Sequence, residues 1–214
     1  GFYKKMGNNK NTSNSQGEII NPGSWAEEEI NKKAEEILAG ARTSEEPKPE
    51  IVTRLPKPEY SESLIKIYQT YENIFGTPRS VFYPACGLDI SPLRGFPNSE
   101  LVFLDPAEYS VVGMKQEGIQ VIQKGIEDYH EKHDLILIMN PHFNPLLALN
   151  NLEYGGRIIA NNYFGAPAAG PLKEFGLPLL RRLTMENGQV VELPLESRID
   201  HEHCFVFGGK NDPK

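Results

Sequence analysis

The feature that most constrains the fold is the alternation of short apolar segments with helical ones in the middle of the chain. A helix is predicted over residues 107–118, between two of these segments. The run at 135–139 is continuously apolar, which is typical of a strand buried on both faces. Strands and helices at this spacing predict a parallel sheet with right-handed crossovers. The predicted strands are residues 80–85, 100–106, 119–124, 134–140 and 156–162.

The alternation of strands and helices stops near the end of the sequence. Residues 188–196 and 203–210 are strand-like, and the stretch between them is too short for a crossover helix. We therefore expect these two strands to pair with each other as an antiparallel hairpin or an equivalent edge. The predicted fold class is α/β, a Rossmann-like three-layer sandwich. Its sheet is mostly parallel and seven-stranded with an antiparallel last strand, and N-terminal helices are added to it.

Two helices are predicted before the first strand. Ser24 and Glu27 form a capping box, and apolar residues follow at helical spacing. A second apolar stripe of helical period covers residues 61–75. A charged, proline-containing linker separates the two helices. The predicted domains are an N-terminal extension with one helix and a linker, residues 1–58, and an α/β domain, residues 59–214.

Charge and composition disfavour several classes of partner. The chain has 22 Lys and Arg residues against 29 Asp and Glu residues, a net charge of −7, and no basic stripe. This balance disfavours nucleic acid and anionic membrane surfaces. No apolar run reaches the ~18 residues of a membrane span, and the start of the sequence lacks the apolar core of a secretory signal. The two cysteines form no CxxC pair, so no structural zinc is expected, and a cytoplasmic location is predicted.

Ligands of an open α/β sheet bind where the strands end, so these positions hold the candidate site. The first predicted strand is followed by the turn YPACGLD, residues 83–89, whose small residues let a ligand approach the backbone. Asp105 ends the second strand, where a carboxylate can accept hydrogen bonds from two ribose hydroxyls. The turn GIED follows the third strand, and NPHF, residues 140–143, follows the fourth.

In this order, the segments resemble class I S-adenosylmethionine (SAM)-dependent methyltransferases over residues 80–209. VFYPACGLD is similar to the family's first motif, FPNSELVFLDP to its second strand with the ribose-binding acid, and GIEDY to its adenine-contacting turn. DLILIMNP and LEYGGRIIANN resemble the fourth and fifth strands, and HCFVFGG the antiparallel seventh. The resemblance implies SAM as the cofactor. The cofactor-binding residues that it implies are Pro84, Ala85, Gly87, Asp89, Asp105, Pro106, Glu127, Asp128 and Asn140.

The first motif departs from the family pattern. The acid that usually ends the first strand is Tyr83, and the first and third glycines of the turn are Ala85 and Asp89. In the family, that acid holds the amino group of the methionine moiety. Here the contact either comes from elsewhere, with Asp89 as the candidate, or is missing.

NPHF is similar to the NPPF or NPPY motif of methyltransferases that act on nitrogen, with His142 in place of the second proline. That resemblance implies that Asn140 accepts a hydrogen bond from a target amine and that the aromatic ring stacks on the substrate. Asn140 and His142 are therefore the candidate catalytic residues, and by position they are the nearest candidates for a general base.

Structural readings of the same residues stay open. Asp105 followed by a proline suits a helix cap, and Cys86 suits a small buried turn residue rather than a nucleophile. Tyr68 and Tyr71 are expected in the core. The histidines of the segment HEH, residues 201–203, lack a clear third ligand, so no metal site is predicted.

Two functions follow from these patterns. The first is a SAM-dependent methyltransferase of unknown substrate, which transfers a methyl group in line to nitrogen or oxygen and works mainly by positioning. The second is a methyltransferase-like domain that no longer methylates and serves as a binding or interaction module. A nicotinamide-dependent oxidoreductase has less support, because ACGLDI supplies one glycine of the required GxGxxG.

Overall fold

The computed structural model describes residues 56–163, 166–196 and 203–209. The chain divides into two units, Gly1–Thr53 and Arg54–Lys214, and every described residue belongs to the second. The helix predicted from Ser24 lies outside the described residues. Within the described part, no helix has the length and apolar character required to cross a membrane.

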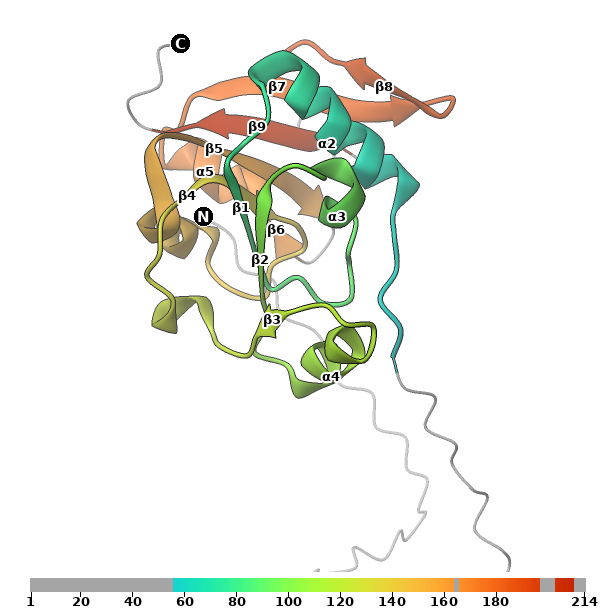
Figure 1. Cartoon of the computed structure of the whole chain (residues 1–214). Helices are drawn as coiled ribbons and strands as arrows, with labels where there is room; N and C mark the ends of the chain where they lie inside the picture. Colours follow the sequence, from blue (N-terminus) through green and yellow to red (C-terminus); the bar gives the residue numbers. More distant parts are fainter. Residues whose placement is uncertain (1–55, 164–165, 197–202, 210–214) are drawn as a thin grey trace, which may run out of the picture. The chain divides into compact units, whose positions relative to one another are not determined.

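One sheet runs through the described unit in the order β3-β2-β1-β4-β5-β9-β7-β8 (Figure 1). The strands β3, β2, β1, β4 and β5 are mutually parallel, as the alternating pattern predicts. The third strand is shorter than expected, and the fifth begins earlier. These five strands are β1 (Ser80–Pro84), β2 (Glu100–Leu104), β3 (Val121–Ile122), β4 (His133–Ile138) and β5 (Leu152–Tyr163).

The last strand, β9 (Cys204–Gly208), is antiparallel to β5, as predicted. The pairing predicted for residues 188–196 and 203–210 is wrong. Instead, β8 (Gln189–Glu192) forms a hairpin with β7 (Leu179–Glu186), and β9 lies between β5 and β7. The hairpin closes at Asn187 and Gly188, which both have positive φ, as a two-residue turn requires.

Two strands of the nine-stranded sheet were not predicted, β7 and the short β6 (Ala166–Pro167), which pairs with β5. The sequence of β7 does not look like a buried strand, because two arginines stand in its middle. Arg182 is nevertheless only 1% exposed, and its guanidinium lies over the Phe205 ring. A buried arginine packed on an aromatic ring looks polar in the sequence but behaves as core in the fold.

One face of the sheet is covered by α2 (Glu62–Phe75), α3 (Pro92–Gly95) and α4 (Glu108–Gln116). The predicted second helix is confirmed: Ser61 caps α2 by accepting a hydrogen bond from the Leu64 N–H at 3.3 Å. Tyr68 and Tyr71 are buried in this layer, as expected, and the Tyr68 ring stacks on Phe96.

The other face is covered by shorter segments, η1 (Ile126–Asp128), η2 (Pro145–Asn151) and α5 (Ala169–Glu174). They enclose a second apolar cluster that includes Phe82, Ile136 and Phe205. The sheet therefore carries a hydrophobic core on each face, and the predicted three-layer α/β sandwich is confirmed.

Candidate functional site

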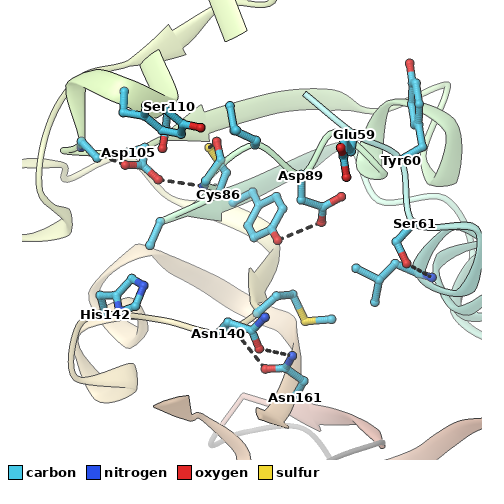
Figure 2. Close-up of a pocket in the computed structure, with 18 of the residues that line it drawn as sticks. Glu59, Tyr60, Ser61, Cys86, Asp89, Asp105, Ser110, Asn140, His142 and Asn161 are labelled. Atoms are coloured by element: carbon cyan, nitrogen blue, oxygen red, sulfur yellow. Dashed lines mark hydrogen bonds between the residues drawn. The ribbon is translucent and has the colours of Figure 1, made fainter. Parts of the chain in front are cut away.

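A cavity of about 760 Å³ opens at the carboxyl ends of β1, β2, β4 and β5 (Figure 2). This is the edge of the sheet at which α/β proteins bind ligands. The short segment that precedes α2, residues 57–61, supplies another wall of the cavity. The site is thus built from strand ends and from the chain that enters the domain.

The turn after β1 has an unusual backbone. Ala85 and Gly87 have φ angles of 51° and 58°, in the left-handed region. Glycine adopts this region at little cost, whereas alanine is strained there. Between them, Cys86 is 3% exposed, and burial raises the pKa of its thiol, which suits a buried turn residue and not a nucleophile.

Asp105 lies beneath this turn and is 5% exposed. Its Oδ2 accepts a hydrogen bond from the Gly87 N–H at 2.7 Å, and its Oδ1 accepts one from the Ala107 N–H at 2.8 Å. The bond to Ala107 fixes the approach to α4. Asp105 is not the cap of that helix, because the N-cap of α4 is Ala107, so the helix-cap interpretation of Asp105 is wrong. An ionised carboxylate has about four acceptor sites, so about two remain for a ligand in the cavity.

Asp89 supplies a second carboxylate to the cavity. The Tyr83 hydroxyl donates a hydrogen bond to its Oδ2 at 2.9 Å, and the Ser91 N–H and hydroxyl donate to its Oδ1. Burial, together with nearby groups that include Asp89, raises the pKa of Tyr83 well above its usual value, so the phenol stays a donor. Tyr83 therefore holds a carboxylate of the following turn at the cavity.

The segment before α2 is attached to the same turn. The Glu59 N–H donates to the Leu88 carbonyl at 2.8 Å, and the Ile90 N–H donates to the Glu59 carbonyl at 3.0 Å. The Ser61 N–H donates to the Ser91 hydroxyl at 2.8 Å. Glu59 and Ser61 were not among the predicted site residues. The one sequence feature that could have indicated them is their position directly before α2, the helix that precedes β1.

Asn140 and Asn161 meet at the ends of β4 and β5 (Figure 2). The Asn140 N–H donates to Asn161 Oδ1 at 3.0 Å, and Asn161 Nδ2 donates to Asn140 Oδ1 at 2.7 Å. Asn140 has a φ of 51°, which asparagine tolerates better than most residues. Asn161 was not predicted as a site residue, because nothing in the sequence pairs it with a residue 21 positions earlier.

The cavity brings together six of the predicted residues and leaves four outside. Pro84, Pro106, Glu127 and Asp128 do not line it. Glu127 folds back on its own turn: a Cβ built on Gly125 would lie 2.5 Å from its Oε2. The predicted residues that line the cavity are Ala85, Gly87, Asp89, Asp105, Asn140 and His142.

The segment HEH is described only at His203, whose Nδ1 lies 3.1 Å from Arg182 Nε. His201 and Glu202 lie outside the described residues. Within residues 56–163, 166–196 and 203–209, no group of three or more His, Cys, Asp or Glu side chains is arranged to hold a metal ion.

Known proteins resemble this chain in structure. No family model and no curated protein sequence matches it. The N-methyltransferase NodS from Bradyrhizobium japonicum WM9, solved with S-adenosylhomocysteine (SAH), has a TM-score of 0.50 at 12% identity, covering 69% of this chain and 86% of NodS. NodS solved in another crystal structure gives 0.48 at 12%, covering 68% and 93%. A SAM-dependent methyltransferase from Thermotoga maritima gives 0.47 at 12%, covering 69% and 88%. The chain thus has the Rossmann-like fold of class I SAM-dependent methyltransferases.

Proposed function

We propose that this chain binds SAM and transfers its methyl group to a nitrogen or oxygen nucleophile. The observation that carries the proposal is Asp105, which is buried at the end of β2, lines the cavity and keeps about two acceptor sites free. The fold supports the same function, because proteins of this fold use this edge of the sheet for the cofactor.

The residues present fit SAM. Asp105 would accept hydrogen bonds from the two ribose hydroxyls, and Asp89 would accept from the amino group of the methionine moiety. Asp89 is prepared for this by the hydrogen bonds from Tyr83 and Ser91, which fix both carboxylate oxygens. Around Gly87 no atom lies within 4 Å of where a Cβ would stand, so the turn leaves open space beside its backbone.

SAM supplies a methyl group already activated by its sulfonium, so the protein has mainly to position the reactants. The acceptor's lone pair would form the bond to the methyl carbon as the carbon–sulfur bond breaks and leaves its electrons on sulfur. The acceptor's proton would leave to solvent or to His142, which is exposed and lines the cavity.

A nitrogen acceptor is the narrower form of the proposal, and Asn140 supports it by position. The aromatic residue of NPHF gives it no support. Phe143 packs against the second apolar cluster and is not among the residues that line the cavity, so its ring is not placed to stack on a substrate there.

Calorimetric titration with SAM and SAH tests the proposal. Wild-type protein should bind both, and Asp105→Asn should weaken binding at least about tenfold, because an amide offers fewer acceptor sites to the ribose. Glu117→Gln makes the same change of charge at the exposed far end of α4 and should bind as wild type does. Absence of wild-type binding at millimolar cofactor would overturn the proposal.

A binding module without methyl transfer is the second candidate, favoured by Ala85 and Tyr83 in the first motif. A methyl-transfer assay with labelled SAM, screened over amines, phenols and proteins, separates the two. Binding of SAH with no transfer to any acceptor would favour the module.

A further inference from the structure

The orientation of the two asparagine amides at the cavity is fixed by their hydrogen bonds. The backbone N–H of Asn140 can only donate, so the Asn161 atom 3.0 Å from it must be the carbonyl oxygen. The Asn161 nitrogen then points at Asn140 and can only donate, so the Asn140 atom 2.7 Å away must also be its oxygen. Amide orientations are usually ambiguous, but here a backbone donor sets both.

The consequence is that Asn140 offers a donor to the cavity. Its Oδ1 is engaged by Asn161, and its Nδ2 lies on the other side of the planar amide, facing into the cavity in Figure 2. Among the described residues, no acceptor is hydrogen-bonded to this nitrogen. Two N–H groups are therefore available to a ligand at the ends of β4 and β5.

The charges around the cavity restrict the net charge of a methyl acceptor that could bind there. Three carboxylates line it, on Glu59, Asp89 and Asp105, and Lys57 also belongs to the lining. Glu59 and Asp89 are paired residues of a parallel bridge, so their side chains share one side of it. An anionic acceptor would be repelled by these carboxylates. A protonated amine has no lone pair on its nitrogen to accept a hydrogen bond from Asn140. A neutral molecule with a hydrogen-bond acceptor meets both conditions.

We propose that Asn161 is a positioning residue that holds Asn140 as a hydrogen-bond donor. The methyl acceptor is then a neutral molecule with a carbonyl oxygen or an unprotonated ring nitrogen beside the atom that is methylated. This inference rests on the proposed function, because it takes the methyl group to be delivered next to Asn140. It assigns one acceptor site of the Asn140 oxygen to Asn161 and the Asn140 amide nitrogen to the methyl acceptor.

Two neutral probes of similar size test the donor. Quinoline carries a ring nitrogen that only accepts, and indole carries an N–H that only donates. In wild-type protein saturated with SAH at mildly alkaline pH, quinoline should bind about fivefold more tightly, the effect of one hydrogen bond. Tighter or equal binding of indole would overturn the proposal.

Asn161→Asp tests the positioning role. A carboxylate at 161 accepts from the Asn140 N–H and also from its Nδ2, so the Asn140 amide should turn and present Oδ1 to the cavity. With SAH at a concentration that saturates the variant, the preference should then shift to indole. Asn187→Asp adds the same charge in the exposed β7–β8 turn and should keep the preference for quinoline. An unchanged preference in Asn161→Asp would contradict the assignment.

A second measurement does not depend on probe affinity. In a crystal structure of the SAH complex at atomic resolution, hydrogens distinguish the two ends of the Asn140 amide. Nδ2 facing the cavity is the expected result, and Oδ1 facing it would overturn the inference. A wild-type protein that binds no SAH would instead refute the proposed function, and the amide orientation would still be decided separately.

Discussion

The backbone strain of the turn after β1 can be measured by substitution at one residue, Ala85. Its φ of 51° is a conformation that costs alanine about 1–2 kcal/mol relative to glycine. We predict that Ala85→Gly raises the free energy of unfolding by about 0.5–1 kcal/mol, since relief of strain exceeds the added freedom of the unfolded chain.

Guanidinium unfolding measures the effect of Ala85→Gly. The control is Ala160→Gly, because Ala160 lies in β5 and is not among the residues with positive φ, so this change relieves no strain and should not stabilise the protein. A lower unfolding midpoint for Ala85→Gly would show that the turn does not hold Ala85 in the left-handed region.

His133 is a buried titratable residue away from the cavity. It is 4% exposed and stacks on Phe82, and its Nε2 lies 2.9 Å from the Tyr129 hydroxyl. Its Nδ1 has no hydrogen-bond partner among the described residues. Burial lowers the pKa of His133 below its usual value, although nearby carboxylates such as Glu131 oppose the shift.

This lowered pKa makes the stability of the protein depend on pH. Below about pH 6.5 the unfolded chain binds the proton more readily than the folded one. The free energy of unfolding should therefore fall as pH drops through 6.5, by up to about 1.4 kcal/mol per pH unit, and level off below the folded-state pKa. His133→Gln should remove this dependence. The exposed His130→Gln should keep it, and equal pH profiles for the two variants would contradict the assignment.

Among the elements, the contact between α2 and α3 leaves no room for a side chain at Gly95. A Cβ added there would lie 2.6 Å from the Tyr68 Cβ. We predict that Gly95→Ala lowers the free energy of unfolding by about 2 kcal/mol, because the buried tyrosine ring has to move.

Gly170 in α5 is the matched case. Its added Cβ would meet nothing nearer than Asn162 Oδ1 at 4.0 Å, so Gly170→Ala should raise the free energy of unfolding by about 0.5–1 kcal/mol. Urea denaturation of both variants checks the pair, and changes of the same sign would contradict the packing described for Gly95.

The elements that the sequence predicted well are those specified locally. The stripe in α2, its cap Ser61 and the buried run of β4 depend on neighbours in the chain. The predicted pairing of β8 with β9 was wrong because β7 pairs with both of them and lies between them. The strand β7 was not recognised in the sequence because two arginines stand in its middle. The site divides in the same way. Asp105 could be predicted because it directly follows a strand. Asn161 and Glu59 could not, because their places in the cavity depend on contacts with residues distant in the sequence.

At the scale of the whole molecule, the fold and the site depend on different parts of the sequence. The three layers need only apolar faces on the sheet and the helices. The chain has these faces although its first motif lacks two glycines and the acid of the family pattern. The cavity depends on particular side chains, and the hydrogen bond from the Tyr83 hydroxyl holds the Asp89 carboxylate there. The glycine pattern of the turn does not by itself reveal that carboxylate.

Binding of the cofactor should be visible as stability of the whole domain. A ligand that binds only the folded state at 100 times its Kd adds about 2.7 kcal/mol to the free energy of unfolding. For a chain of this size we predict that SAH raises the Tm by about 5–10 °C. NAD⁺ should leave the Tm unchanged, because the turn after β1 lacks the glycines of a dinucleotide site. A shift with NAD⁺ and none with SAH would favour the oxidoreductase instead. Under the proposed function, Asp105→Asn should reduce the SAH shift, because an amide would offer fewer acceptor sites to the ribose.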